Sequence, residues 1–439
     1  MIKKTIATLV FGLLLHTGFA QTFDKAKLDN YFQELEKSNR FMGSVALSEN
    51  GKVVYTKSIG FADIETNTKS NENTKYRIGS ISKSFTSTLV LKAIEEKKLK
   101  LDTKLNSYFP GITNADKITI SNLLDHRSGI HNFTNDSTYL DWNNQAKSEA
   151  EMVKIIEIGG SDFEPDSKAE YSNSNYVLLS YILQKVYKKP YSEILTEKII
   201  KPVGLKNTYV GGKINLKDNE CSSYKFGTTW IKEKETDMII PMGAGDIVST
   251  PSDLTKFAYA LFNGKIISAK SLELMKTMKD HYGYGLFQMP FGDKISYGHT
   301  GGIDGFSAVY GYFSTEKVGF ALTSNGSNYN NNDISIVLLS AIFNKTYEIP
   351  SFKSYDVTTA ELDKYLGLYS SKDIFLKITV TKEGKTLMAQ ATSQSAFGLE
   401  ATEKDKFKFE AAGIKMEFNP AEKTMILRQG GSSFTFTKE

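Results

Sequence analysis

The sequence predicts an α+β fold, an antiparallel sheet with flanking helices and a mainly helical subdomain, followed by a small all-β C-terminal domain. Three observations predict it. Strand-like segments lie near residues 43–59 and again from Ile295 onward, so one sheet must be assembled from distant parts of the chain. Residues 105–180 between them are mostly helix and loop. From Leu376 onward, apolar and polar side chains alternate, as in antiparallel strands with one buried face.

Two hairpins are predicted within the first of these domains. Residues 43–47 and 53–59 are short apolar runs, and the turn between them contains Asn50-Gly51, which favours a tight hairpin. Residues 306–313 and 318–323 flank a second turn at 314–317. These four segments are therefore expected to be strands of the central sheet.

Helical spacing is clearest in two places. Leu28, Phe32 and Leu35 form one stripe within residues 23–35. After Gly79-Ser80, a longer pattern places apolar residues at near-helical intervals, namely Ile81, Phe85, Leu89, Ala93 and Ile94. We therefore expect a long helix that begins at about Ser80.

The first twenty residues have the pattern of a secretory signal. Lys3 and Lys4 precede an apolar run, and Gly18 and Ala20 occupy small-residue positions before Gln21. The run is short for a bilayer-spanning helix, which needs about 20 apolar residues, although an uncleaved N-terminal anchor is the alternative. We expect cleavage of a signal peptide, residues 1–20, giving a periplasmic or secreted protein that does not span the membrane.

The expected domain organisation places the larger α+β domain at residues 21–347, a linker at 348–355 and the small antiparallel β domain at 356–439. The tail carries no histidine and no cysteine. It therefore offers no catalytic constellation of its own.

Composition excludes several classes of function. Signal cleavage lowers the net charge from +4 to +2, which gives no general case for a nucleic acid or an anionic membrane as partner. The single cysteine, Cys221, cannot form an internal disulfide. The histidines show no metal-binding spacing, so we expect neither a metal site nor a cofactor.

Ser80 and Lys83 are the first candidate catalytic residues. Residues three apart on a helix share a face, so the serine hydroxyl and the lysine amine can meet. A desolvated amine can lose its proton and act as a base toward the serine. The spacing alone is weak evidence, because Ser222 with Lys225 and Ser314 with Lys317 repeat it.

Two later motifs strengthen the interpretation. Tyr171 and Asn173 stand two residues apart, which in an extended segment places both on one side. A phenol of depressed pKa can shuttle a proton, and a carboxamide can bind a substrate amide. His299-Thr300-Gly301-Gly302 enters a strand, and its glycines would let a ligand lie against the strand edge. Each motif alone is more often structural.

Taken in order, these motifs resemble those of the serine β-lactamase and penicillin-binding superfamily, whose S-x-x-K signature is well defined. The Tyr-x-Asn form of the middle motif is similar to the branch of class C β-lactamases, D-alanyl-D-alanine carboxypeptidases and esterases, which also includes D-amino-acid amidases. Segments outside the motifs resemble the same family, among them 41–45, 123–130, 202–205 and 249–254. The resemblance spans about residues 23–345, and the tail resembles the accessory β domain of many exported members.

The resemblance implies a serine β-lactamase-like fold and a role for each motif residue. Ser80 would form an acyl-enzyme, with Lys83, Tyr171 or both moving its proton. Asn173, His299, Thr300 and Gly301 would bind the substrate. Backbone N–H groups of Ser80 and Gly302 would form the oxyanion hole. Loops at 132–147 and 216–241 would shape the pockets on either side.

His299 narrows the expected chemistry. β-Lactamases usually carry lysine there, a fixed positive charge facing a substrate carboxylate. A histidine of ordinary pKa is mostly neutral at pH 7. We therefore expect a hydrolase of small amides or esters, of peptidase, amidase or esterase type, with cell-wall peptides among the candidate substrates and little β-lactamase activity. The alternative is a non-catalytic binding or scaffold relative of penicillin-binding proteins.

Overall fold

The computed structural model describes residues 23–352, 355–392, 394–429 and 432–439. The expected signal peptide at residues 1–20 lies outside the described residues. Among the described residues, the structure contains no helix that is long and apolar enough to cross a membrane.

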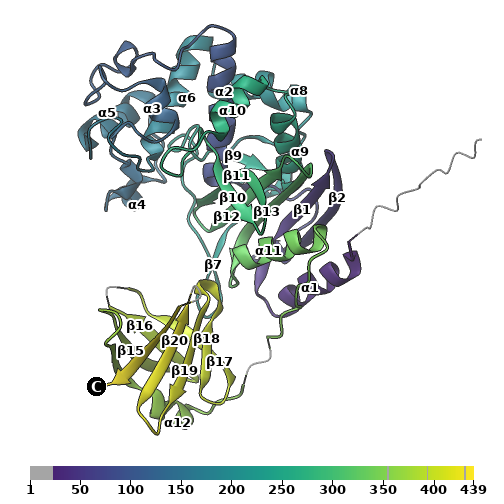
Figure 1. Cartoon of the computed structure of the whole chain (residues 1–439), viewed down its shortest axis with the longest axis vertical. Coiled ribbons are helices and arrows are strands. Elements are labelled where there is room, and N and C mark those ends of the chain that lie inside the picture. The colour runs from purple at the N-terminus through teal and green to yellow at the C-terminus, as the bar shows by residue number, and fades with distance from the viewer. Residues whose placement is uncertain (1–22, 353–354, 393, 430–431) are drawn as a thin grey trace, which may run out of the picture.

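A six-stranded antiparallel sheet forms the centre of the larger domain (Figure 1). Its strand order is β10-β11-β12-β13-β1-β2. The strands span β1 Phe41–Glu49, β2 Lys52–Ile59, β10 Phe287–Phe291, β11 Lys294–Ile303, β12 Phe306–Phe313 and β13 Val318–Ser327. Both predicted hairpins are confirmed, and Ala46 of β1 pairs with Ala321 of β13, which joins distant parts of the chain as expected.

Helices cover both faces of this sheet. On one face, α9 (Pro251–Phe262) packs against β12, β13 and β1, with Phe257 next to Tyr310. On the other face, α1 (Lys25–Lys37) and α11 (Asn331–Ile342) pack over β1, β2 and β13. Leu28, Phe32 and Leu35 of α1 are buried there, as the helical stripe predicts.

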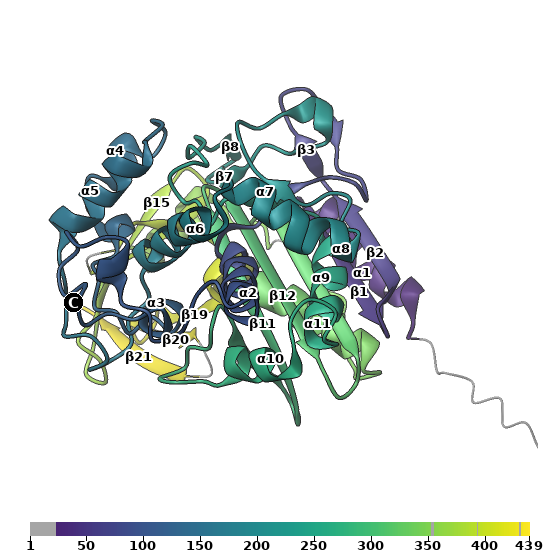
Figure 2. The same ribbon diagram turned by 90° about the horizontal axis from the view of Figure 1, so that it is seen from above.

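A mainly helical subdomain lies beside the α9 face of the sheet (Figure 2). Its helices are α2 Ser82–Glu95, α3 Ile120–Leu124, α4 Tyr139–Trp142, α5 Glu149–Gly159, α6 Asn173–Tyr187, α7 Tyr191–Leu195, α8 Lys201–Val203 and α10 Ala269–Lys276. Three short strands, β5 Tyr76–Arg77, β9 Ile247–Ser249 and β6 Tyr209–Val210, form a small sheet, and two further pairs are β3 Phe61–Asp63 with β4 Thr68–Lys69 and β7 Tyr224–Phe226 with β8 Trp230–Lys232.

Helix α2 packs against α6 and α7 within this subdomain, and its hydroxyl side chains are buried along with its apolar ones. Each buried hydroxyl needs a hydrogen-bond partner. Ser84 Oγ donates to the carbonyl of Gly285 at 2.6 Å, and Thr86 Oγ1 donates to the carbonyl of Gly243 at 2.6 Å. The helix that carries Lys83 is therefore held by polar contacts on several sides.

The C-terminal domain is a closed eight-stranded barrel, which confirms the predicted small antiparallel β domain. The sheet closes on itself, so its single buried face becomes the barrel interior, where Val380, Met416 and Phe436 pack together. After α12 (Thr359–Leu362), its strands span β14 Gly367–Ser371, β15 Lys377–Glu383, β16 Thr386–Ala391, β17 Phe397–Glu403, β18 Lys406–Phe409, β19 Ile414–Asn419, β20 Thr424–Gln429 and β21 Ser432–Lys438.

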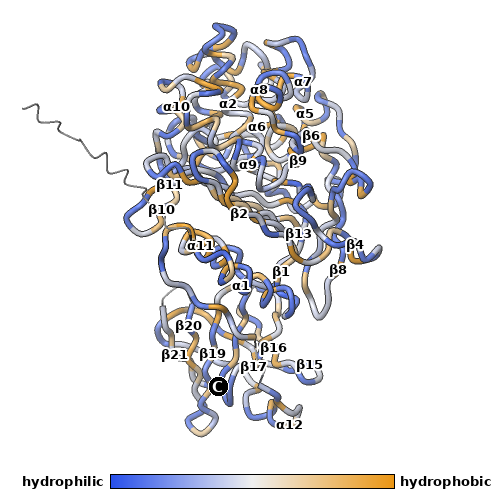
Figure 3. The backbone as a smooth tube through the Cα atoms, turned by 90° about the vertical axis from the view of Figure 1, so that its right-hand side faces the viewer, coloured by the Kyte–Doolittle hydropathy of each residue, from blue (hydrophilic) through white to orange (hydrophobic). Residues whose placement is uncertain are grey.

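The barrel contacts the larger domain on the side of α1 and α11, which lie between the sheet and the barrel (Figure 3). Arg40 forms an ion pair with Glu400 of β17. The ring of Phe352 lies 4.8 Å from the Arg40 guanidinium and 5.2 Å from Lys408 Nζ. This ion pair and the ring of Phe352 are therefore contacts that join the two domains on this side.

Candidate active site

Ser80 and Lys83 meet at the junction between a short 3₁₀ turn and helix α2. The turn, η1 (Gly79–Ile81), leads directly into α2, so Ser80 stands just before the helix that carries Lys83. Lys83 is fully buried. Its Nζ lies 3.0 Å from Ser80 Oγ, 2.7 Å from Asn173 Oδ1 and 2.7 Å from the carbonyl oxygen of Ala244. The predicted serine–lysine pair is thus in hydrogen-bond contact.

The surroundings of Lys83 favour its neutral form. Burial lowers the pKa of this amine well below its usual range, and the nearby buried Asp246 opposes that shift only in part. A neutral amine has two N–H groups and one lone pair. It can donate to Asn173 and to the Ala244 carbonyl while its lone pair accepts the proton of Ser80 Oγ. The geometry therefore suits a base toward Ser80.

Tyr171 lies beside this pair, and its environment differs from the expected one. Burial raises its pKa, whereas a hydrogen bond to Ser80 lowers it less, so the phenol is neutral in the free protein. The expectation of a depressed phenol pKa is wrong, because the surroundings of Tyr171 offer few groups to solvate a phenolate. A neutral phenol can donate a proton to another group but cannot accept one.

His126 holds the segment that carries Tyr171. Its ring centroid lies 4.5 Å from that of Tyr171, and its Nδ1 accepts a hydrogen bond from the backbone N–H of Ser172 at 3.2 Å. Burial lowers the pKa of His126 well below the ordinary value, so it stays a neutral acceptor. His126 and Tyr171 lie far apart in the sequence, so no motif spacing could have indicated their contact.

Asn173 is the first residue of α6 and is already hydrogen-bonded through its whole amide group. Its Oδ1 accepts from Lys83, and its Nδ2 donates to Thr134 Oγ1 at 2.9 Å. Its backbone N–H donates to Asn132 Oδ1 at 3.0 Å. Thr134 and Asn132 belong to the 132–147 loop, so this loop orients Asn173.

Strand β11 approaches the serine turn through glycine. A Cβ on Gly301 would lie 2.0 Å from the carbonyl oxygen of Ile78 and 3.0 Å from the amide nitrogen of Ser80. A Cβ on Gly79, whose φ is +51°, would lie 2.8 Å from the amide nitrogen of Gly302. Because Gly79 and Gly301 have no side chains, the backbones of Ser80 and Gly302 can lie close together.

His299 is buried on β11 and packs against Phe287, with ring centroids 4.4 Å apart and the ring planes tilted by 37°. Its Nδ1 is hydrogen-bonded to the carbonyl of Thr300. Burial, with a smaller contribution from Lys83, lowers the pKa of His299 to about 3. His299 is therefore neutral across the physiological pH range. The sequence also indicated a mostly neutral histidine, but from its ordinary pKa and not from burial.

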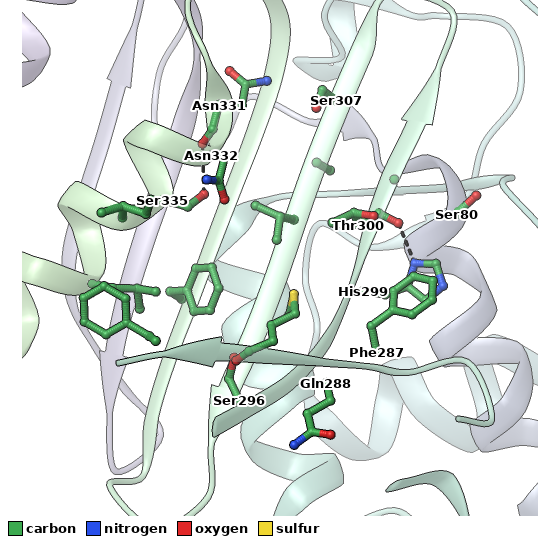
Figure 4. A pocket seen from close by; sticks show the side chains of 18 of the residues that line it. Ser80, Phe287, Gln288, Ser296, His299, Thr300, Ser307, Asn331, Asn332 and Ser335 are labelled. Atoms are coloured by element: carbon green, nitrogen blue, oxygen red, sulfur yellow. Dashed lines mark hydrogen bonds between the residues drawn. The ribbon is translucent and has the colours of Figure 1, made fainter. Parts of the chain in front are cut away.

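Two cavities meet at Ser80. The first has a volume of about 740 Å³ and contains Tyr171, His299 and Thr300 in its wall (Figure 4). The second has a volume of about 700 Å³ and contains Asn173. Its wall also includes parts of both loops named above, from Phe133 to Asn143 and from Lys225 to Pro241.

The other two S-x-x-K matches lack this environment. Ser222 Oγ donates to Asp63 Oδ2 at 2.8 Å instead of facing a lysine. Ser314 and Lys317 are exposed in the turn between β12 and β13. Burial of the amine is therefore what separates Lys83 from Lys225 and Lys317.

A serine hydrolase is defined by the fold together with the buried lysine and the glycine-lined strand. Comparison with known proteins identifies its family. The profile described as Beta-lactamase matches residues 28–340, so the chain belongs to the β-lactamase family. It is 30% identical over 326 residues to a putative penicillin-binding protein PbpX of Bacillus subtilis, covering 74% of this chain and 78% of that one. It is also 30% identical over 292 residues to the teichoic acid D-alanine hydrolase of Staphylococcus aureus, covering 65% and 70%.

Solved structures agree with this assignment. A D-amino acid amidase from Ochrobactrum anthropi superposes with a TM-score of 0.63 at 27% identity, covering 72% of this chain and 99% of that chain. An octameric penicillin-binding protein homologue from Pyrococcus abyssi superposes with a TM-score of 0.65, covering 94% and 100%, and at 22% identity it supports the fold alone. The chain is a hydrolase of this family.

Proposed function

We propose that this protein is an exported hydrolase that cleaves an amide or ester of a D-amino acid through an acyl-enzyme on Ser80. The observation that supports the proposal most directly is the fully buried Lys83, with Nζ 3.0 Å from Ser80 Oγ. The named activities of two relatives, a D-amino acid amidase and a teichoic acid D-alanine hydrolase, suggest the substrate class.

Acylation begins when Ser80 Oγ attacks the substrate carbonyl and its proton passes to the neutral Lys83. The carbonyl oxygen gains negative charge, and the backbone N–H groups of Ser80 and Gly302 stabilise it. A donor of this kind is worth about 3 kcal/mol of barrier. The close approach of the two backbones at Gly79 and Gly301 supports this pairing.

The leaving group then needs a proton. Tyr171, a neutral phenol hydrogen-bonded to Ser80, passes one to it and is reprotonated from Lys83. In a second step water attacks the acyl-enzyme and gives its proton to the neutral Lys83, which passes that proton to Ser80 Oγ as the acyl group leaves. Asn173, His299, Thr300 and Gly301 hold the substrate, and Asn173 also positions Lys83 through its Oδ1.

A panel of four substrates tests this proposal. We expect hydrolysis of a D-amino-acid amide and a p-nitrophenyl ester to be fast, that of a D-alanyl-D-alanine peptide to be slower, and that of nitrocefin to be weak or absent. The last expectation follows because neutral His299 offers no fixed charge to a β-lactam carboxylate. Nitrocefin as the best substrate, or no turnover of any of the four, would refute the assignment.

The pH dependence of acylation should respond to Asp246. Burial raises the pKa of Asp246 itself to about 7, and while its carboxylate is ionised it favours the ammonium form of Lys83 and so raises the pKa of that amine. Only the neutral amine accepts the serine proton, so activity falls as the pH drops through the Lys83 pKa. Asp246→Asn should move the acid limb of the kcat/KM profile to lower pH. An acid limb at the wild-type pH, or at a higher pH, in a variant with a normal unfolding temperature would contradict this role of Asp246.

We further propose that residues 21–347 form the catalytic unit, that 348–355 link it to the barrel and that residues 356–439 are accessory. A signal peptide at residues 1–20 would deliver the protein to the periplasm or the medium. The support is the sequence pattern of those residues, together with a relative named for teichoic acid.

A further inference from the structure

The first cavity extends well beyond the reacting groups. It leads from Ser80 and Thr300 across the sheet to Asn331 and Ser335 of α11 (Figure 4). Between these ends its wall is apolar, with side chains from β10, β12, β13 and α11, namely Phe287, Met289, Val309, Phe320, Ile336 and Leu339. A cavity of about 740 Å³ can take a group much larger than an ammonia or methanol leaving group.

The position of Tyr171 indicates which part of the substrate enters this cavity. The group that protonates a leaving group must lie beside it. Tyr171 lines the first cavity and does not line the second, whereas Asn173 lines only the second. The leaving group therefore faces the first cavity, and the acyl group faces the second.

The charges around the two cavities also differ. No lysine or arginine of the described chain lines the first cavity. Its polar side chains, besides Ser80 and Tyr171, are serine, threonine, asparagine, glutamine and the neutral His299. The lining of the second cavity, in contrast, is charged, with Lys225, Lys232 and Lys234 beside Glu233 and Asp304. A leaving group that carries a carboxylate would find no counter-charge on its own side.

We propose that the first cavity binds an uncharged apolar leaving group, such as an alcohol or amine that carries an alkyl chain or an aromatic ring. This inference rests on the proposed acyl-enzyme chemistry and adds the substrate class on its leaving-group side. It also separates this protein from carboxypeptidases, whose leaving group is an amino acid with a free carboxylate. Burial of the chain against the apolar wall supplies the binding energy.

Methyl, butyl and octyl esters of D-alanine test the proposal, since they share one acyl group and differ only in the leaving alcohol. Burial of each additional methylene group raises the binding affinity about fourfold. We expect kcat/KM to rise from the methyl to the octyl ester by about tenfold or more. A D-alanyl-D-alanine peptide should be cleaved with a lower kcat/KM than the octyl ester.

Two matched variants locate the effect in the cavity. Ile336 lines the cavity and is 43% exposed, whereas Ile295 is 47% exposed and does not line it. Ile295 precedes Ser296, which faces the cavity, so its side chain points to the other face of the sheet. Ile336→Asp should remove most of the preference for the octyl ester over the methyl ester, whereas Ile295→Asp should preserve that preference.

The outcomes distinguish this inference from the function on which it rests. Equal kcat/KM for the methyl and octyl esters, or a preference that survives Ile336→Asp, would overturn the apolar leaving-group site while the acyl-enzyme stands. Failure to hydrolyse any D-alanine ester, with no acylation of Ser80, would overturn both. A D-alanyl-D-alanine peptide as the best substrate would overturn the inference alone.

Discussion

Replacement of Ser80 with alanine is expected to lower kcat/KM for the best substrate by roughly 10⁴- to 10⁶-fold. The variant keeps the turn, the helix and the cavity but has no oxygen to attack the carbonyl. Because Ser80 is half-buried and its side chain is small, the unfolding temperature should change little. Initial rates of D-amino-acid ester hydrolysis measure the loss, and thermal unfolding verifies the fold.

Ser314→Ala is the matched control for this experiment. Ser314 has the same spacing to a lysine as Ser80, but it lies exposed in the β12–β13 turn. Its replacement should leave every rate constant unchanged. Comparable losses in both variants, or residual activity of Ser80→Ala near the wild-type level, would mean that another group carries the reaction.

Replacement of Lys83 with methionine is expected to slow acylation by about 10²- to 10⁴-fold, the usual contribution of a positioned base. Methionine fills a similar volume but cannot accept the serine proton. Rapid mixing with an activated ester separates acylation from deacylation. Lys317→Met, in the exposed turn, should acylate at the wild-type rate.

Stability must be measured alongside, because Lys83 also occupies two buried acceptors. Asn173 Oδ1 and the carbonyl of Ala244 would each lose a donor, and an unpaired buried group costs about 1–3 kcal/mol. We therefore expect Lys83→Met to unfold at a lower temperature than the wild type. A folded Lys83→Met protein that acylates at the wild-type rate would refute the role of Lys83 as the base toward Ser80.

The fold could be predicted largely from local patterns. Asn50-Gly51 marked the first hairpin, and both residues have positive φ there. The apolar stripe at residues 28–35 predicted α1 equally directly, and the alternation in the tail predicted its antiparallel strands. Closure of the tail into a barrel could not be predicted, because alternation indicates a buried face but not the number of strands or the pairing of β14 with β21.

The candidate site was predictable as a set of residues but not as a chemical environment. Motif order selected Ser80, Lys83, Tyr171 and Asn173, and the structure brings them together. Protonation depends on burial, which involves contacts distant in sequence. Asp246 beside Lys83 and Phe287 against His299 are such contacts, and no spacing rule links them.

The protonation state of Tyr171 depends on its surroundings and not on its motif. A motif can specify a phenol, but the sign of its pKa shift depends on how many groups solvate the phenolate. Here burial outweighs the hydrogen bond between Tyr171 and Ser80, and the phenol stays protonated. We therefore propose Lys83 as the base and Tyr171 as the proton donor.

The most direct test of the account is the site of covalent modification by an active-site serine reagent. The intact protein, treated with a fluorophosphonate, should gain the mass of one adduct, and peptide mapping should place it on Ser80. Ser80→Ala should gain none, and Ser314→Ala should label fully. No adduct on folded wild-type protein, or an adduct on any other residue, would contradict the acyl-enzyme on Ser80.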